Sequence, residues 1–339
     1  MQIKRKIHLL IPDLLWPVVD DRSKKVQNRP RFIEKLLTRA KRQKFDGADL
    51  EQTLFHLFDV FSDKDCDPPV GAVAYVGDGG NPAGYCWARA TPVHLFADGD
   101  QLITLGPEHL EILQSEAESL VSLFNSHFAK DELSLVIKHL ESWYLKLPTC
   151  LNVKTYQIES VVGHPIEEYL PLGIDRSRLL NLLNEIQMLF YQCDVNEKRR
   201  TGGSNVINGI WFSGFGQVPS LNTNFDAIFS SIPFAKGLAK LSNTDHYEFN
   251  GRLPEINNSL KNIIIVFSDF MESKRFFDIA KWQHSLIELN KSLSSYLRKE
   301  WKKSELVIYN CRGLRFDVDR SRFMSGFLKK TKAFQSHDW

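Results

Sequence analysis

Two arginines and two asparagines in one polar segment are the side chains of this sequence best suited to hold an anion. Arg199 and Arg200 are adjacent, and Asn205 and Asn208 follow them after a glycine pair. A guanidinium group can donate two parallel hydrogen bonds to a carboxylate or phosphate, so paired arginines suit such ligands. The alternative interpretation makes the arginines surface charges on a loop and the asparagines turn residues whose amides satisfy the backbone.

A second candidate pair, Arg89 and His94, lies in a stretch predicted to be a strand. Side chains five positions apart point to opposite faces of a regular strand. The pair can therefore line one cleft only if a bulge or bend intervenes between the two residues. The ten histidines of the chain show neither HExxH nor H-x-H spacing, so the sequence does not predict a zinc enzyme.

One acidic residue, Asp13, lies two positions after a short apolar run that ends at Ile11. In open parallel α/β sheets, functional groups gather in the loops at the carboxyl ends of the strands. Two further loops of this kind are predicted at Ser268–Glu272 and Asn310–Gly313. Asp13 is therefore the acidic side chain with the best position for function, and its alternative role is to anchor a turn.

The elements that must position these side chains are predicted to form an α/β fold. Lys6–Ile11, Asn262–Phe267 and Glu305–Tyr309 are short apolar runs typical of strands buried on both faces. A helix from about Phe276 to Leu297 separates the last two strands, and this order predicts a parallel βαβ unit. We expect a doubly wound, mostly parallel core sheet.

A smaller α/β domain is predicted to interrupt this core. Its expected strands are Tyr85–Phe96, Gln101–Leu105 and the alternating region Leu133–Leu147, with an amphipathic helix over Pro107–Phe124. The expected boundaries give a core made of residues 1–66 and 165–339 and an inserted domain of residues 67–164.

Composition indicates which classes of partner and which cellular compartment to expect. The 43 lysines and arginines nearly balance the 41 aspartates and glutamates, which disfavours a generic nucleic-acid binder. Neither a signal peptide nor an apolar stretch of membrane-spanning length is present, so we expect a cytoplasmic protein without membrane contact. The odd number of cysteines and the lack of any C-x-x-C spacing predict reduced thiols, against a zinc site or a disulfide framework. The cysteines are Cys66, Cys86, Cys150, Cys193 and Cys311.

Residues 194–216 (DVNEKRRTGGSNVINGIWFSGFG) resemble a stretch of the archaeal-type cofactor-independent phosphoglycerate mutases. In that family a Val-Asn-x-x-Arg run is followed by an Asn shortly before an Ile-Trp-x-x-Gly-x-Gly strand and loop. Residues 87–95 (WARATPVHL) further resemble a bacterial branch described as regulatory proteins of the RpfE type. The resemblance implies an alkaline phosphatase-like core, with the inserted domain in the place of the substrate domain, and it places Arg199 and Arg200 against a substrate phosphate or carboxylate.

The same resemblance implies a chemistry that uses two divalent metals and a transiently phosphorylated Ser or Thr. Asp13 stands where the family has its first acidic ligand, and Thr53 and Ser62 are the candidate hydroxyls, though neither lies in a nucleophile motif. No histidine occurs in 267–274, Asn310 and Cys311 occupy the place of an adjacent Asp and His, and the only later histidine is His337. The metal site is therefore predicted to be degenerate, with no cofactor and with Asp13 as its remnant.

We accordingly predict a non-catalytic phosphoglycerate mutase-like protein that binds a small anionic ligand or a protein partner in a regulatory role. One alternative is an active phosphoglycerate mutase or phosphohydrolase that depends on manganese or another divalent metal. A second alternative is a nucleic-acid-binding regulator that uses the basic stretches Arg22–Lys44 and Arg320–Lys332. That second alternative requires the two stretches to share one face.

Overall fold

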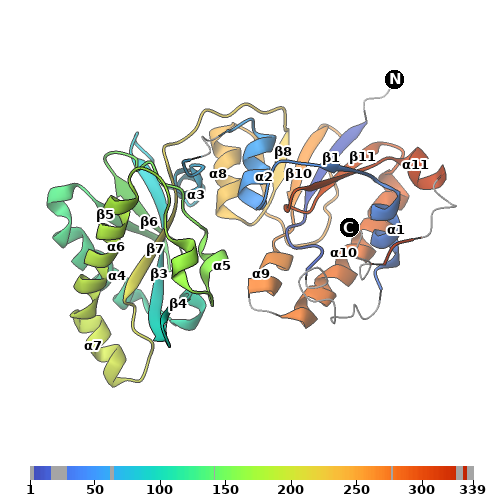
Figure 1. Ribbon diagram of the computed structural model, residues 1–339. Coiled ribbons are helices and arrows are strands. Elements are labelled where there is room, and N and C mark those ends of the chain that lie inside the picture. The colour runs from blue at the N-terminus through green and yellow to red at the C-terminus, as the bar shows by residue number, and fades with distance from the viewer. Residues whose placement is uncertain are drawn as a thin grey trace. The chain divides into compact units, whose positions relative to one another are not determined.

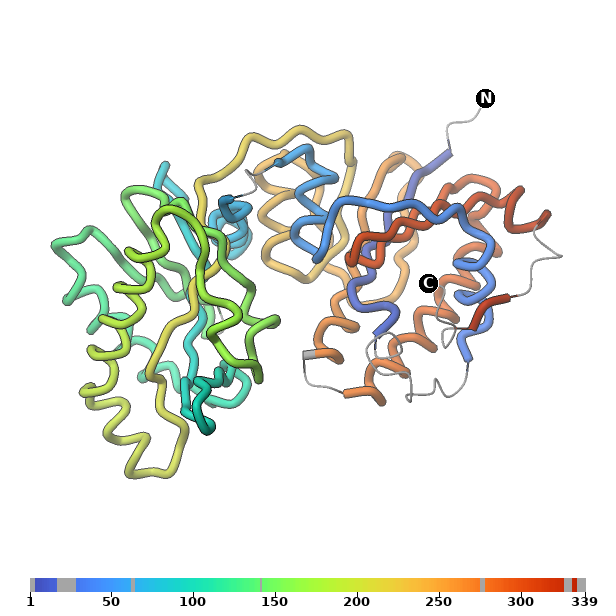
Figure 2. The backbone as a smooth tube through the Cα atoms, viewed as in Figure 1, coloured from blue at the N-terminus to red at the C-terminus, as the bar shows by residue number. Residues whose placement is uncertain are grey.

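The computed structural model describes residues 4–16, 29–61, 65–140, 142–275, 278–325 and 331–333. The chain forms two compact units, which we name the core unit (Met1–Val60 and Leu221–Trp339) and the inserted unit (Phe61–Ser220). Figure 1 shows their helices and strands, and Figure 2 shows that the blue and the orange-to-red parts of the chain share one unit. The core unit thus consists of two separate stretches of the chain, and the inserted unit is the continuous stretch between them.

The boundaries of the inserted unit differ from the predicted ones at 66/67 and 164/165. The first break lies at Val60, and the second lies at Ser220, well beyond the expected position. The reason is strand β7 (Gly209–Gly216), which pairs with β3 (Cys86–Asp98) of the inserted unit from Gly209 to Gly216. The helices between residue 165 and β7 therefore also belong to the inserted unit.

The core unit contains a seven-stranded sheet in the order β2-β12-β11-β1-β10-β8-β9. The five strands from β11 to β9 are parallel to one another. At the other end of the sheet, β12 runs antiparallel to β11, and β2 runs antiparallel to β12. The mostly parallel α/β core predicted from the sequence is confirmed. The strands are β1 (Arg5–Leu10), β2 (Lys41–Lys44), β8 (Ala227–Phe229), β9 (Asp245–Tyr247), β10 (Asn262–Val266), β11 (Ser304–Tyr309) and β12 (Leu314–Val318).

Helices cover both faces of this sheet, which explains why its central strands are continuously apolar. On one face, α10 (Ile279–Glu300) buries apolar side chains at helical spacing from Trp282 to Leu297, beside α1 (Arg31–Arg39). On the other face, Phe55 of α2 (Leu50–Leu57) contacts Phe234 of α8 (Pro233–Leu241), with ring centroids 4.9 Å apart. Strand β10, helix α10 and strand β11 form the predicted βαβ unit, with β1 lying between the two strands.

The inserted unit is built on a second, antiparallel sheet in the order β4-β3-β6-β5, with β7 paired to β3. Its other strands are β4 (Gln101–Leu105), β5 (Ser134–His139) and β6 (Ser142–Leu147). The helices are α3 (Val70–Gly77), α4 (Gln114–His127), α5 (Ile158–Val161), α6 (Arg176–Tyr191) and α7 (Asp194–Thr201). Leu120 and Phe124 of α4 and Ile186 of α6 are fully buried in one apolar cluster with strand residues.

Two glycines let α3 approach this sheet closely. A Cβ on Gly71 would lie 2.5 Å from the Cα of Ala88 on β3, and a Cβ on Gly214 would lie 2.8 Å from the Cβ of Val70. Gly214 also has a φ of +69°, in the left-handed region that favours glycine. The close packing of α3 against the sheet therefore explains why glycine stands at positions 71 and 214.

The helix predicted over Pro107–Phe124 differs from the structure. It begins only at Gln114, after a short 3-10 turn over Pro107–His109, because the Glu116 side chain accepts from Leu113 N at 2.9 Å and starts the helix there. Helix α1 ends at Arg39, and Lys41–Lys44 form β2 against β12. The polar segment from Asp194 begins with α7, so Arg199 and Arg200 lie on a helix and not on the loop of the alternative interpretation.

The cysteine prediction is wrong for one pair. Cys86 and Cys150 form a disulfide, with their Cα atoms 5.2 Å apart. Antiparallel pairing places Cys86 opposite Leu147, and this pairing brings the next residues of the chain within reach of Cys86. Cys66, Cys193 and Cys311 are free thiols. In the part of the chain that the structure describes, no helix has the length and apolar character needed to cross a membrane.

Candidate functional site

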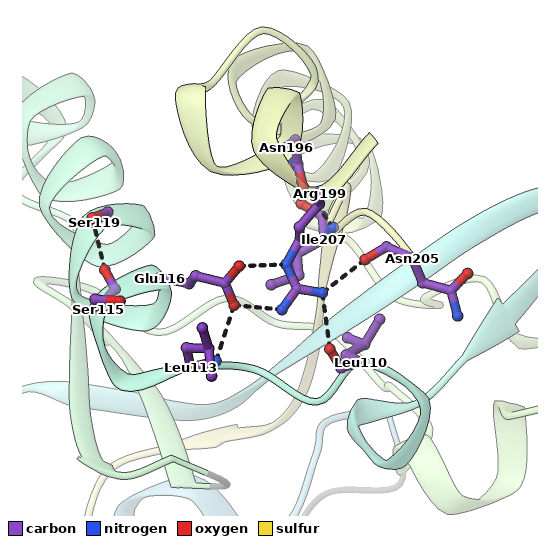
Figure 3. Close-up of polar contacts among 9 residues, drawn as sticks. All are labelled: Leu110, Leu113, Ser115, Glu116, Ser119, Asn196, Arg199, Asn205 and Ile207. Atoms are coloured by element: carbon purple, nitrogen blue, oxygen red, sulfur yellow. Dashed lines mark hydrogen bonds and ion pairs between the residues drawn. The ribbon is translucent and has the colours of Figure 1, made fainter. Parts of the chain in front are cut away.

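The guanidinium of Arg199 donates most of its hydrogen bonds to groups of the inserted unit (Figure 3). Its Nε and Nη2 donate to the two carboxylate oxygens of Glu116 at 2.9 and 2.5 Å. Its Nη1 donates to the carbonyl oxygens of Leu110 and Asn205, both at 2.8 Å. Four of the five N–H groups of a guanidinium are thus used by the protein itself. The structure gives Arg199 an internal ion pair in place of the predicted external anion.

This ion pair joins the first turn of α4 to α7. Arg199 is 5% exposed, and the side chain of Glu116 is 18% exposed. Burial raises the pKa of Glu116, but the hydrogen bonds from Arg199 and from Leu113 N, together with the charge of Arg199, outweigh burial and lower that pKa below its usual value. The pair is therefore charged at neutral pH and fixes two helices relative to each other.

The asparagine of the Val-Asn-x-x-Arg run has a similar structural role. Asn196 is fully buried and its Nδ2 donates to the carbonyl oxygens of Phe190 and Ile207, both at 2.8 Å. Its Oδ1 accepts from Ile207 N at 2.8 Å. Asn196 and Arg199 together hold the loop that leads into β7. These two side chains of residues 194–216 therefore stabilise the fold of the inserted unit.

The remaining residues of the predicted anion site point to other partners. Arg200 donates to the carbonyl oxygen of Tyr191 at 3.2 Å and to Glu197 Oε2 at 2.8 Å, and its guanidinium lies 5.4 Å from the Tyr191 ring centre. Asn205 Nδ2 donates to His109 O at 3.2 Å. Arg199 and Arg200 thus do not converge on one point.

Asn208 satisfies the backbone of β3. Its Oδ1 accepts from Leu95 N at 2.7 Å, and its Nδ2 donates to Leu95 O at 2.8 Å. This two-way amide contact is the backbone-satisfying role given above as the alternative interpretation.

Arg89 and His94 do not form a joint site. The pairing of β3 with β7 has an irregularity between Trp87 and Arg89, and it is regular from Arg89 to Val93. The two side chains therefore lie on opposite faces of β3. His94 Nδ1 is 2.9 Å from the carbonyl oxygen of Val206.

Asp13 lies in a charged cluster at the carboxyl end of β1 in the core unit. Its Oδ1 is 2.5 Å from Arg312 Nη2 and 3.3 Å from Lys274 Nζ. The Asp13 side chain is 14% exposed, while those of Arg312 and Lys274 are 34% and 39% exposed. The backbone holds Asp13 in the left-handed region at a φ of +56°, and its carbonyl oxygen accepts from Trp282 Nε1 at 3.1 Å. We name Asp13, Lys274 and Arg312 the carboxyl-edge cluster.

Loops from neighbouring parallel strands supply this edge with further polar groups. After β8 and β10, Ser231 Oγ and Ser268 Oγ lie 3.3 Å apart. After β11, Asn310 Oδ1 accepts from Arg312 N at 2.9 Å and from Leu314 N at 3.0 Å, which fixes the turn that presents Arg312. The sequence predicted the loops after β10 and β11, but the loop after β8 and the role of Lys274 and Arg312 as partners of Asp13 were not predicted. The sequence did contain an indication, because Arg312 lies in the predicted loop Asn310–Gly313 and Lys274 lies two positions after the predicted loop Ser268–Glu272.

The residues at this edge do not fit a centre of two divalent metals. Such a centre needs carboxylates and histidines whose charge the metals balance. The Asp13 carboxylate is balanced instead by an ammonium and a guanidinium. Burial and the nearby charge of Glu272 raise the pKa of Asp269, a further carboxyl after β10. Among the residues that the structure describes, no three His, Cys, Asp or Glu side chains are grouped so that they could hold a metal ion.

The candidate hydroxyl and the nearby thiol are buried. Thr53 is fully buried, and its Oγ1 donates to Asp49 O at 2.6 Å. Burial raises the pKa of the Cys311 thiol well above its usual value, so Cys311 is not a thiolate nucleophile at neutral pH. Ser62 and His337 lie outside the described residues.

Part of the amino-acid sequence of this chain is similar to those of two known mutases. The chain is 28% identical over 98 residues to a 2,3-bisphosphoglycerate-independent phosphoglycerate mutase of Methanothrix thermoacetophila, covering 27% of this chain and 25% of that protein. It is 25% identical over 148 residues to the enzyme of the same name from Methanosarcina barkeri, covering 41% of this chain and 37% of that protein. This chain resembles the cofactor-independent phosphoglycerate mutases. The chain therefore spans only about a quarter of the length of the first of these mutases and less than two fifths of the second.

Similarity of fold extends further than similarity of sequence to the mutases. The PH0037 protein of Pyrococcus horikoshii has a TM-score of 0.55 to this chain and 12% sequence identity, and the match covers 97% of this chain and 94% of that protein. The α/β class, with a parallel core sheet and a separate antiparallel sheet, is therefore shared over nearly the whole chain. No protein-family profile matches the chain.

Proposed function

We propose that this chain is a non-catalytic relative of the mutases that binds a small anion, carrying phosphate or carboxylate, in a regulatory role. The observation that carries the proposal is the pairing of Asp13 with both Lys274 and Arg312 at the carboxyl edge. In metal-dependent phosphoryl transfer, divalent cations balance the protein carboxylates and the transferring group. Here two side chains provide the positive charge that balances Asp13.

The charge of the cluster supports an anionic ligand. One carboxylate faces two cations, so the three side chains carry a net charge of about +1 at neutral pH. The cations remain partly exposed, and the Ser231 and Ser268 hydroxyls lie at the same edge of the sheet. Guanidinium and ammonium groups beside hydroxyl donors suit phosphate and carboxylate oxygens. A protein partner that presents a carboxylate or phosphate would meet the same groups.

The first test is a coupled assay of 3-phosphoglycerate conversion to 2-phosphoglycerate with added manganese, repeated with Asp13→Ala. We expect no turnover above background in either protein. Turnover that is lost in Asp13→Ala would overturn the proposal and favour the alternative of an active metal-dependent mutase or phosphohydrolase.

A second experiment, calorimetric measurement of inorganic phosphate binding, tests whether the carboxyl-edge cluster binds an anion. Phosphate binding should weaken in Arg312→Ala and remain unchanged in Arg298→Ala, an exposed arginine of α10.

One observation favours a second candidate function, nucleic-acid binding. The described parts of the two basic stretches adjoin, because Arg39 Nη1 donates to Phe323 O at 2.6 Å and Lys332 N donates to Thr38 Oγ1 at 2.9 Å. Residues 22–28 and 326–330 lie outside the described residues. Lys41 and Lys44 on the sheet edge are exposed near this contact. Salt-dependent binding of duplex DNA that weakens in a Lys41→Ala/Lys44→Ala variant would support this function, and salt-independent or absent binding would contradict it.

A further inference from the structure

A groove of about 680 Å³ lies at the amino edge of the core sheet, the opposite edge from Asp13. The second half of α10 forms one wall, the loop Arg252–Asn258 forms the other, and Arg5 at the start of β1 contributes to the lining. Its volume is in the range of sites that bind small organic molecules. None of the residues discussed in the carboxyl-edge cluster lines this groove.

Hydrogen bonds from a buried arginine fix the loop wall. Arg5 is 6% exposed, and its Nη2 donates to Ile256 O and Asn257 O at 3.1 and 3.0 Å. Its Nε donates to Leu260 O at 3.1 Å. Leu253 N also donates to Ser292 Oγ of α10 at 3.2 Å, which ties the loop to the opposite wall. The groove is therefore formed before any ligand arrives, which lowers the entropic cost of binding.

The lining combines excess positive charge with apolar surface. Five cations line the groove against three carboxylates. Of these carboxylates, Glu288 is paired with Lys291 at 2.7 Å, and Glu300 lies 4.0 Å from Arg5. Arg252 interacts electrostatically with Glu288, and the side chains of Arg252, Lys299 and Lys303 are exposed at the groove. Leu253, Ile256 and the Tyr296 ring supply the apolar part of the walls.

We infer that this groove binds a small organic anion that carries both a multiply charged group and an apolar or aromatic body. Lys299 and Lys303, one helical turn apart at the end of α10 and in the following turn, contact the phosphate or carboxylate groups. The apolar body lies against Leu253 and Tyr296. The groove is a site separate from the carboxyl-edge cluster, so the inference stands or fails independently of the proposed function.

Three probes separate the two parts of this inference. Phenyl phosphate carries the charge and the ring, inorganic phosphate carries only the charge, and benzyl alcohol carries only the ring. We expect phenyl phosphate to bind the full chain with a millimolar or lower dissociation constant and to bind about tenfold more tightly than either of the other two probes. Amide NMR titration of the wild-type chain should place its shift changes on Arg252–Asn258 and on the second half of α10.

A matched set of variants completes the test. The double variant Lys299→Ala/Lys303→Ala should weaken phenyl phosphate binding about tenfold or more, because each loss removes a charged hydrogen-bond donor. Lys302→Ala removes an exposed lysine of the same turn that does not line the groove, and it should leave binding unchanged. Equal weakening by Lys302→Ala, loss of binding in Arg312→Ala, inorganic phosphate that shifts the amides of Arg252–Asn258 with the same affinity as phenyl phosphate, or no saturable binding would each overturn the inference.

Discussion

Arg312 Nη2 lies 2.5 Å from Asp13 Oδ1, and this contact joins the turn after β11 to the turn after β1. The two strands are neighbours in the core sheet, and Lys274 reaches the same oxygen from α9 (Asp269–Arg275), just beyond β10. A single carboxylate therefore holds together the loops of three adjacent strands.

Replacement of this carboxylate should change ligand affinity and stability in opposite directions. In Asp13→Asn, Lys274 and Arg312 lose their counter-charge, so we expect inorganic phosphate to bind about tenfold more tightly. The same change should lower the free energy of unfolding by about 1–2 kcal/mol, because the contact is partly buried. Calorimetry and urea titration measure the two effects. Asp245→Asn, which changes an exposed carboxylate on β9, is the control, and weaker phosphate binding in Asp13→Asn would contradict the proposed anion site.

The ion pair between Arg199 and Glu116 should contribute strongly to stability. Glu116→Gln leaves a guanidinium that is 5% exposed without its counter-charge, and we expect a loss of about 3 kcal/mol in the free energy of unfolding. The matched control is Glu197→Gln, which removes the exposed partner of Arg200 on the same helix and should cost less than about 0.5 kcal/mol. Urea titration of the two variants measures the difference. Equal effects would show that the buried pair is not the stronger anchor.

A buried histidine predicts a loss of stability in acid. His8 is 4% exposed in β1, and its Nδ1 lies 3.0 Å from the hydroxyl of Tyr309. Burial, with the charges of Lys6 and Arg315, lowers the pKa of His8 from 6.5 to about 3. Burial also raises the pKa of Tyr309 to about 12, so its hydroxyl stays neutral.

Because the pKa of His8 is lowered in the folded chain, the free energy of unfolding decreases as the pH falls. Above pH 6.5 His8 is neutral in both the folded and the unfolded chain. As the pH falls from 6.5 towards about 3, the unfolded chain takes up a proton that the folded chain excludes, so stability falls by about 1.4 kcal/mol per pH unit. Between pH 7 and pH 5, wild type should therefore lose about 2 kcal/mol more than His8→Gln does. Urea titrations at both pH values test this, with His284→Gln on the surface of α10 as the control.

The disulfide predicts a definite thiol count. Under denaturing conditions without reductant, Cys66, Cys193 and Cys311 should react with a thiol reagent, while Cys86 and Cys150 should react only after reduction. Because the bond closes a loop across 64 positions, its reduction should lower the stability of the inserted unit by about 4 kcal/mol in the chain-entropy description. A protein that shows all five thiols before reduction, when purified without reductant, would contradict the bond.

The sequence predicts the core sheet better than it predicts the contacts between distant residues. The strands near Leu9, Ile265 and Ile308 are recognisable because each is apolar on both faces, which is a property of a few consecutive residues. The partner of Arg199, Glu116, lies 83 positions away, and no local pattern connects them. The same holds for Cys86 and Cys150.

The carboxyl-edge cluster illustrates the same limit at the candidate site. Its loops could be located because strand ends are local features, and Asp13 was identified in this way. The roles of Lys274 and Arg312 depend on which strands are neighbours in the sheet. The boundary at Ser220 was missed for the same reason, because the pairing partner of β7 could not be deduced from the residues of β7 itself.

The placement of β1 has a consequence for the order in which the chain folds on the ribosome. β1 is synthesised well before its two neighbours in the sheet, which begin only at Asn262 and Ser304. All strands of the inserted sheet lie in one continuous segment, Phe61–Ser220, and are complete long before then. The inserted unit can therefore acquire its structure during translation, while the apolar β1 stays unpaired and accessible to chaperones until β10 and β11 have been made.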